Sequence, residues 1–593
     1  MLRSPLSQLQ EITPSKKTLK GHLRRAERLT LRHAHRFIVQ RASNLREARR
    51  HALGWLLLVV SLVGLAMWQQ DLTVSSYTAA IPSEGGVYSE GAVGALNNLN
   101  PILASSAAER SGSRLLFAQL LRYDDKGDLV GELAHRWHAE EGGKVYFLSL
   151  RPEARWQDGT PITADDVVFT FDMIKNADTR SPLYSSWRNV VVEKVDQTTV
   201  KFILPTPLAA FASSLTIGIL PKHALADIRP AEMRTADFNL HPTVVSGPFI
   251  FQDMNVIEAR VHNLLRLKAN PTYVLGAPKL SGFHLHAYED REVMTDAFLS
   301  HEVASLSDVD TDQLNRLGDP ATFVQTNAPL YNATYAFLKN DSHILSDVRV
   351  RQALQHATDQ KAILDLLENR QQFLLGPLLP GQLGYRDDMG QGGYTLERAQ
   401  ALLDSAGWVK GPDGRRTKDG QPLVLRLVTI SSGDFPAVAE KLMNQWQELG
   451  ITFESQLMRS EDIQQSAIAP RGYDILVYEI AIGRDPDVFA FWHSSQANAQ
   501  GFNLSNYKSA KADEALESAR VRLDPALRDA KYRFFLQQWI ADAPAIGLYR
   551  STLGYVENKN VVSFKSHPVV DQTDRYFDIR SWAAGQTVGR PTR

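Results

Sequence analysis

An uninterrupted apolar run near the N-terminus constrains this chain more than any other feature of its sequence. Residues 52–68 (ALGWLLLVVSLVGLAMW) contain no charged side chain. This length lies at the short end of what spans a bilayer, about 17–25 residues. Trp55 and Trp68 stand near its two ends, where tryptophans concentrate at membrane interfaces. We predict an uncleaved transmembrane helix; the alternatives are a buried core helix and a cleaved signal peptide, although signal peptides lack so long a charged region before the apolar run.

The residues before this run are strongly basic. Residues 1–50 contain thirteen Lys or Arg and three Asp or Glu, a net charge of about +10, whereas the whole chain carries −1. The run is preceded by Arg41, Arg46, Arg49 and Arg50, while only Asp71 and polar residues follow it. The positive-inside rule therefore predicts a cytoplasmic arm (residues 1–51), a polar linker (residues 69–86) and a body outside the cell. The arm acts as a topology signal, lies on anionic lipid, or contacts nucleic acid.

The body is long enough for more than one hydrophobic core. The chain has 593 residues, whereas a single core stops growing at about 250–300. Its hydrophobic share of 44% and charged share of 22% are typical of globular proteins. It contains no cysteine, which excludes disulfides, cysteine-ligated zinc, thiol nucleophiles and a lipid-modified cysteine anchor. Because the arm is basic, the rest of the chain is acidic, and a globally basic nucleic-acid binder is excluded.

Strand and helix signals alternate along the body. Residues 145–150 alternate as a strand, and Thr163 is placed to cap a helix that runs through residue 174. Thr395 caps a second helix, which Gly407 ends. Residues 423–430, 435–449 and 451–457 predict a strand, a helix and a strand, which together make a βαβ unit. The predicted fold class is α/β with at least two sheets.

Motifs that would indicate catalysis are missing. The sequence has no phosphate-binding loop, no glycine-rich dinucleotide turn, no G-x-S-x-G and no H-E-x-x-H. We therefore predict a protein that is not an enzyme and carries no cofactor.

Two sequence patterns contain candidate metal ligands, but neither predicts a metal site. His284 and His286 alternate along one face of a strand, for which a solvated sheet face is a better interpretation than a metal site. Residues 308–312 imitate the start of a calcium loop, but Gln313 replaces the glycine that the loop needs at its sixth position. We predict no metal site.

Several segments resemble the extracytoplasmic solute-binding proteins of ABC importers, family 5, the oligopeptide, dipeptide and nickel class. The most specific is residues 150–167 (LRPEARWQDGTPITADDV). The other matching segments are residues 96–101 (LNNLNP), 246–249 (SGPF), 270–273 (NPTY), 347–354 (DVRVRQAL), 406–408 (AGW) and 506–507 (NY). Their order and spacing agree over about residues 86–565.

This resemblance implies a two-lobe periplasmic-binding-protein-like fold behind the transmembrane helix. Residues 87–329 begin lobe I, residues 330–544 form lobe II, and residues 545–593 return to lobe I and form the tail. Such proteins capture a solute by lobe closure and deliver it to an ABC transporter permease. The implied partners are therefore permease subunits, a peptide or other small molecule and the cell membrane, with no nucleic acid. Two alternatives remain: a ligand sensor that signals through the basic arm, and a membrane-bound hydrolase.

The resemblance also implies a set of ligand-facing residues, drawn from loops in both halves of the body. They are Asn97, Asn98, Leu99, Tyr184, Ser246, Gly247, Pro248, Phe249, Ala481, Ile482, Gly483, Arg484, Asp485, Asp487 and Tyr549. The tryptophan of the W-x-x-D-like element of peptide binders is missing here, and the aspartate is shifted. Asp485 then pairs with a peptide amino terminus, Arg484 meets an anionic group, or Asp485 and Asp487 merely cap a helix. We expect Asp485→Ala and Tyr184→Ala to weaken ligand binding with little loss of thermal stability.

Overall fold

The computed structural model describes residues 55–56, 58–65, 69, 79–82, 85–257, 262–368 and 371–589. The chain divides into two compact units, Met1–Ile81 with Val588–Arg593, and Pro82–Thr587. The second unit is the body predicted from the sequence. The predicted arm lies outside the described residues, as do most of the linker and residues 52–54, 57 and 66–68 of the apolar run.

The described part of the apolar run is helical. Residues 55–56 and 58–65 have helical backbone, and their large apolar side chains are exposed, Trp55 at 70% and Leu62 at 57%. Within the described residues, no helix combines the length and the hydropathy needed to cross a membrane.

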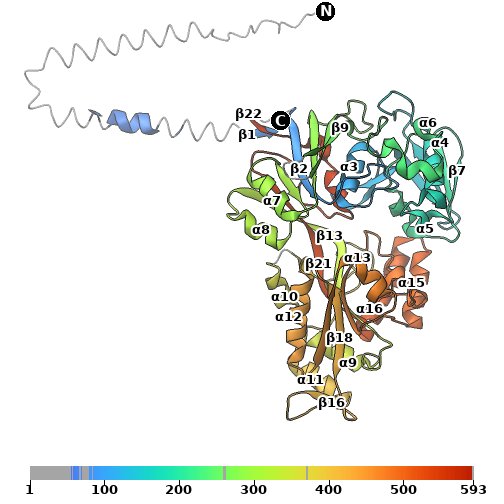
Figure 1. Ribbon diagram of the computed structural model, residues 1–593, viewed down its shortest axis with the longest axis vertical. Helices are drawn as coiled ribbons and strands as arrows, with labels where there is room; N and C mark the ends of the chain where they lie inside the picture. The colour runs from blue at the N-terminus through green and yellow to red at the C-terminus, as the bar shows by residue number, and fades with distance from the viewer. Residues whose placement is uncertain are drawn as a thin grey trace, which may run out of the picture. The chain divides into compact units, whose positions relative to one another are not determined.

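One large mixed sheet runs through the body (Figure 1). Its strands, in spatial order, are β19 (Thr452–Met458), β18 (Val424–Ile430), β20 (Ile475–Ala481), β13 (Phe323–Leu338), β21 (Ala545–Asn558), β12 (Ser305–Ser307), β2 (Val87–Val93), β11 (Gly282–Tyr288), β10 (His262–Ala269) and β9 (Phe249–Ile257), with β14 (Gln372–Phe373) paired to β21. The two longest strands, β13 and β21, are antiparallel neighbours at its centre. They belong to both lobes of the body.

Each long strand passes from one hydrophobic core to another. Along β13, Ala328 and Leu330 pack in the core of lobe I, whereas Tyr331 and Ala333 pack in a core of lobe II. The pairing of β13 with β21 is irregular between Pro329 and Ala333, at the same place. The body is therefore two lobes connected by a pair of strands, the fold that the resemblance implies.

In lobe II, alternate side chains of β13 face two different hydrophobic cores on the two sides of the sheet. Tyr335 and Phe337 of β13 face a core that includes residues of α15 (Ala510–Arg520) and α16 (Pro525–Asp542). Ala336 and Leu338 face the opposite core, which includes residues of α9 (Val348–His356) and α12 (Phe435–Gln447). This follows from the two-residue period of a strand. Figure 1 shows α15 and α16 on one side of the central strands, and α12 with α10 (Gln360–Leu366) on the other.

The remaining elements complete the two lobes. In lobe I these are α3 (Ala107–Leu116), β3 (Leu121–Tyr123), β4 (Leu129–Gly131), the antiparallel sheet of β5 (Ala134–Glu140), β6 (Val145–Leu150), β8 (Thr199–Ile203) and β7 (Val191–Lys194), α4 (Ala164–Lys175), α5 (Tyr184–Trp187), α6 (Lys222–Leu225), α7 (Arg291–Leu299) and α8 (Thr311–Leu317). In lobe II they are α11 (Leu396–Ser405), β15 (Val409–Lys410), β16 (Arg416–Lys418), β17 (Gln421–Pro422), α13 (Ser460–Ile463) and α14 (Phe489–Trp492). Outside these lobes, β1 (Ala79–Pro82) pairs with β22 (Gln586–Gly589).

The local predictions are confirmed at several places. β6 occupies the predicted strand, and α4 begins after Thr163, whose amide donates to Asp166 Oδ2 at 2.8 Å. The helix α11 begins after Thr395 and is followed by Gly407 with φ +87°. β18 and β19 are parallel with α12 between them in sequence, so the predicted βαβ unit is present.

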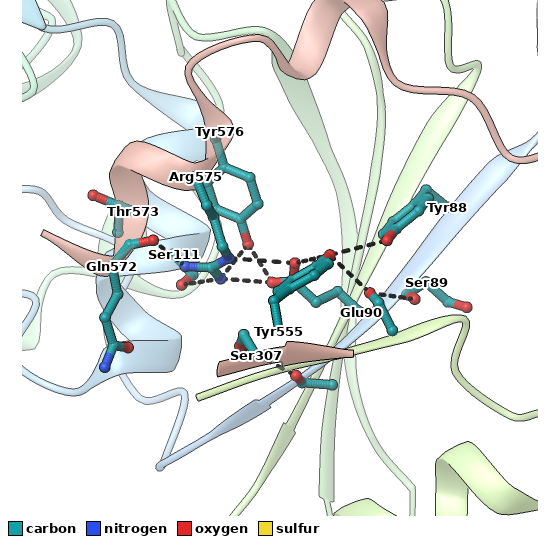
Figure 2. A network of polar contacts seen from close by, with 12 residues as sticks. Tyr88, Ser89, Glu90, Ser111, Ser307, Tyr555, Gln572, Thr573, Arg575 and Tyr576 are labelled. Carbon is teal, nitrogen blue, oxygen red and sulfur yellow. Dashed lines mark hydrogen bonds and ion pairs between the residues drawn. The ribbon is translucent and has the colours of Figure 1, made fainter. Parts of the chain in front are cut away.

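A buried polar network ties the C-terminal segment to lobe I (Figure 2). The Arg575 guanidinium donates two hydrogen bonds to the Glu90 carboxylate of β2, from Nη2 to Oε1 at 2.6 Å and from Nε to Oε2 at 3.3 Å. The hydroxyls of Tyr576 and Tyr555 donate to the same carboxylate at 2.5 and 2.9 Å. The two charged side chains are only 1% and 0% exposed. Every charge in this network has partners, which is the condition for burying an ion pair.

Candidate functional site

A cavity of about 400 Å³ lies in lobe I. Its wall is built by segments far apart in sequence: the loop after β2, α3, the turn at α5, residues 214–218 and the returning segment near residue 571. Pro101, Leu183 and Trp187 contribute apolar surface, and Arg110, Asp571 and Asp574 contribute charge. A concave, largely apolar wall with a few charged groups suits a small polar ligand.

The charged groups of the cavity include both signs. Arg110 Nε lies 3.5 Å from Asp571 Oδ2, and both side chains are about half exposed, at 42% and 45%. Asp574 is half-buried and accepts from the amides of Asp571 and Val570 at 2.9 and 3.0 Å. Burial, with the nearby Asp571 charge, raises the pKa of Asp574 to about 7. The wall therefore offers partners for a cation and for an anion.

Charges of lobe II reach the same wall. Burial raises the pKa of Tyr123, a lining residue, to about 12; a hydrogen bond to Ser213 opposes this, and the charges of Asp574, Asp485 and Arg484 have smaller effects. Arg484 itself bridges the lobes. Its Nε donates to the carbonyl of Gly127 at 3.0 Å, and its Nη2 lies 3.3 Å from Asp128 Oδ1. The anionic partner that the structure gives to Arg484 is thus a carboxylate of lobe I.

Asp485 is already paired within lobe II. Its two oxygens accept from Arg528 Nη2 at 2.6 Å and Nη1 at 2.9 Å, and the side chains are 18% and 8% exposed. Asp485 Oδ1 also accepts from the Asp487 amide at 3.1 Å. Asp487 in turn lies 3.1 Å from Arg520 Nε. The Asp485 carboxylate therefore has a cationic partner without any ligand.

Hydrogen bonds to Leu116 and from Asn270 hold the segment 246–249 in place. The amides of Ser246 and Gly247 donate to the carbonyl of Leu116 at 3.1 and 2.7 Å. Asn270 donates to the carbonyls of Gly247 and Pro248 at 2.8 and 2.9 Å. These hydrogen bonds join the SGPF and NPTY segments into one local structure.

Other residues implied by the resemblance lie in or against the cores. Leu99 and Phe249 are fully buried in the core of lobe I, and Tyr549 is 3% exposed in a core of lobe II. The Asn97 amide donates to Glu109 at 3.1 Å, and Asn98 Oδ1 accepts from the Asn100 amide at 2.8 Å.

Two parts of the implied set stand closer to the lobe surfaces. Tyr184 is half-buried and begins α5, between the lining residues Leu183 and Ser186. Ala481 ends β20, and the Ile482 amide donates to the Tyr331 carbonyl at 2.8 Å. Gly483 follows with φ +84°, which turns the chain toward Arg484. Contact of these residues with a ligand stays a prediction.

Arg110, Asp571 and Asp574 were missed by the sequence analysis. The only local signal was the D-x-x-D spacing of residues 571–574, which forms a capping box at the 3-10 helix Gln572–Tyr576. Nothing in the local sequence places Arg110 beside them, because the chain returns to lobe I only after lobe II is complete.

One sequence interpretation is wrong. His286 does not lie on a solvated sheet face, since it is only 6% exposed and packs against His262. The residues that imitate a calcium loop instead form a cap. Asp310 accepts from the Gln313 amide at 2.9 Å and is the N-cap of α8.

Comparison with known proteins accounts for this architecture. The model of the bacterial extracellular solute-binding proteins, family 5, matches residues 128–503, more than half of the chain. The chain belongs to this family.

Relatives and solved structures agree with that assignment. This chain is 25% identical to the oligopeptide-binding protein AppA of Bacillus subtilis over 524 residues, which cover 85% of this chain and 93% of AppA. The structure of AppA with a nonapeptide has a TM-score of 0.66 at 23% identity and covers 85% of this chain and 99% of that one. NikZ of Campylobacter jejuni, in complex with Ni(L-His), has a TM-score of 0.69 at 24% identity and covers 84% and 99%. These likenesses extend over the whole two-lobe body.

Proposed function

We propose that this chain is a membrane-anchored receptor that binds peptides or similar small solutes between its lobes and delivers them to an ABC transporter permease. The observation that carries the proposal is family-5 membership, matched over residues 128–503. The peptide class comes from relatives matched over most of their length, namely AppA and the probable D,D-dipeptide-binding periplasmic protein DdpA of Escherichia coli.

The chemistry of the lobe I cavity suits such a ligand. A peptide carries both charges and apolar side chains, and the wall combines the Arg110–Asp571 pair with the apolar surfaces of Leu183 and Trp187. Because the two charges are about half exposed, a ligand can replace either partner without desolvating a buried ion.

Lobe closure is the proposed capture step. The lobes are connected by β13 and β21, whose pairing is interrupted between Pro329 and Ala333, and a break in a strand pair is a natural place to bend. Arg484 crosses from lobe II to Gly127 and Asp128 of lobe I. Contacts of this kind favour the closed arrangement, and a bound solute would favour it further.

Residues 52–68 are the proposed anchor. Their composition, the basic residues before them and the exposed apolar side chains of the helical residues 58–65 support this assignment. A helix would take the place of the lipidated cysteine that this chain cannot have, and would hold the receptor near its permease at high effective concentration.

Native mass spectrometry of the purified protein, followed by peptide titration, tests the ligand. Small-angle scattering with and without the identified ligand tests closure, and uptake in cells lacking the permease tests delivery. We expect Arg484→Ala to weaken ligand affinity by about fivefold to thirtyfold, since a charge-assisted contact contributes roughly 1–2 kcal/mol. Arg459→Ala, which removes an exposed arginine of the same lobe, is the matched control. Scattering profiles that superimpose with every peptide tested would contradict the proposal.

A further inference from the structure

Two histidines and a glutamate meet on lobe I, apart from the residues that line the cavity. His262 is the first residue of β10, and His286 lies in the neighbouring strand β11. His262 pairs with Tyr288 in the antiparallel register, so His286 is its diagonal neighbour on the same face of the sheet. Glu302 comes from the turn after α7, where its amide donates to the carbonyl of Ala297 at 2.8 Å.

The donor atoms of the three side chains converge on one point. His262 Nε2 lies 3.1 Å from His286 Nδ1 and 3.5 Å from Glu302 Oε1, and His286 Nδ1 lies 3.8 Å from the same oxygen. Zinc takes nitrogen and oxygen ligands at about 2.0–2.1 Å in a tetrahedron, whose edges are then about 3.3–3.4 Å long. The three measured edges bracket this value, so shifts of a few tenths of an ångström would place all three donors at bonding distance from one ion.

The surroundings resemble those of a metal site more than those of a solvated face. His262 and His286 are 3% and 6% exposed, whereas the side chain of Glu302 is 30% exposed. Burial in general disfavours the charged form of an imidazole. Metal ligation requires neutral imidazole.

Neighbouring groups hold the ligands in place. The Tyr288 hydroxyl donates to Glu302 Oε1 at 3.4 Å, and its ring stacks on His262 with a centroid distance of 4.4 Å. Partners behind the ligands orient them and fix which nitrogen faces the ion. A hydrogen bond between the two imidazoles would account for their contact alone, but not for the carboxylate that lies within 4 Å of both nitrogens.

We propose that His262, His286 and Glu302 form a binding site for Zn²⁺ or a similar borderline divalent transition-metal ion. Two imidazoles and one carboxylate make a set that these ions prefer over Mg²⁺ or Ca²⁺, which take oxygen ligands. Three protein ligands leave a fourth tetrahedral position, which water fills on the side where Glu302 is exposed. The site connects β10, β11 and the turn after α7, and it does not depend on the proposed solute.

Metal binding by the full-length purified protein tests this inference. The protein is stripped with EDTA, and Zn²⁺ affinity is measured by competition with a chromophoric chelator while bound zinc is counted by mass spectrometry. We expect one tight equivalent in the wild type, and at least tenfold weaker binding in His286→Asn and Glu302→Gln. His284→Asn is the matched control, because it removes a histidine from the same strand face without removing a donor of the group.

Three further readouts separate ligation from folding. Glu302 is partly exposed, so Glu302→Gln is expected to fold, which circular dichroism checks. Zn²⁺ should raise the Tm of the wild type and of His284→Asn but not of the other two variants. Co²⁺ should give the visible absorption of a tetrahedral site in the same two proteins. No tight equivalent in the wild type, or equal binding in all variants, would overturn the proposal, and loss in His284→Asn alone would overturn the ligand set.

Discussion

Removal of Arg575 is the most demanding test of how this fold is held together. Its guanidinium is 1% exposed and donates to Glu90, to Ser111 Oγ and to the carbonyl of Gln572. Arg575→Ala would leave the fully buried Glu90 carboxylate with only two tyrosine hydroxyls as donors. Breaking a buried pair in this way costs about 3–5 kcal/mol. At about 1.4 kcal/mol per tenfold change, the unfolding equilibrium shifts by roughly two to four orders of magnitude.

Urea unfolding followed by tryptophan fluorescence measures this loss. Trp582 is a local reporter, because its ring lies 5.2 Å from Tyr88 and 5.8 Å from Tyr576. Arg316→Ala is the control, since that arginine is 40% exposed in its pairs with Glu292 and Asp296 and should cost less than about 1 kcal/mol.

A double variant separates the pair from its surroundings. Glu90→Gln with Arg575→Met removes both charges, and it should recover most of the loss, because replacing both members of a buried pair is often nearly neutral. If the free energy of unfolding of Arg575→Ala lies within 1 kcal/mol of that of Arg316→Ala, the network does not hold the C-terminal segment and the reasoning fails.

Three further variants test separate features. Asp485→Asn leaves the buried Arg528 beside a neutral amide and should cost about 2–3 kcal/mol in urea unfolding, contrary to the expectation from sequence that stability stays nearly unchanged. Burial raises the pKa of Glu557 to about 7, so the folded state holds an extra proton and stability falls as pH rises from about 4.5 to 7. Glu557→Gln should flatten that fall in Tm between pH 5 and pH 8, and an unchanged slope would contradict it. Gly247→Ala would place a Cβ 2.5 Å from the Leu116 carbonyl carbon and should destabilise lobe I by at least about 1 kcal/mol, whereas a Tm equal to wild type would show that the backbone yields.

Local structure was predictable where the signal lies within a few residues. The segment 150–167 follows β6 with a turn and the cap of α4, and each step depends on neighbours in sequence. The βαβ unit of β18, α12 and β19 was predictable for the same reason. The alternation of side chains along a strand does not say which core each face joins. In β13 only the tertiary structure decides this, since Tyr335 and Ala336 lie in different cores.

The candidate site was predictable only in part. Resemblance directed attention to the loops around Tyr184 and Arg484, which do lie beside the cavity wall and between the lobes. It also implied Leu99, Phe249 and Tyr549, which the structure places in cores. A sequence motif contains both residues that shape a loop and residues that contact a ligand, and the sequence alone does not distinguish the two kinds.

From the sequence follow the apolar run, the class of fold, the strand-turn-helix units and the family, because each depends on composition or on contacts between near neighbours. The tertiary structure decides which distant groups meet. It brings Arg575 to Glu90 across 485 positions, Asp571 to Arg110, and two histidines to Glu302. Those contacts depend on how strands from both ends of the chain pair in one sheet. Pairing is set by the burial of whole faces and not by any short stretch of residues.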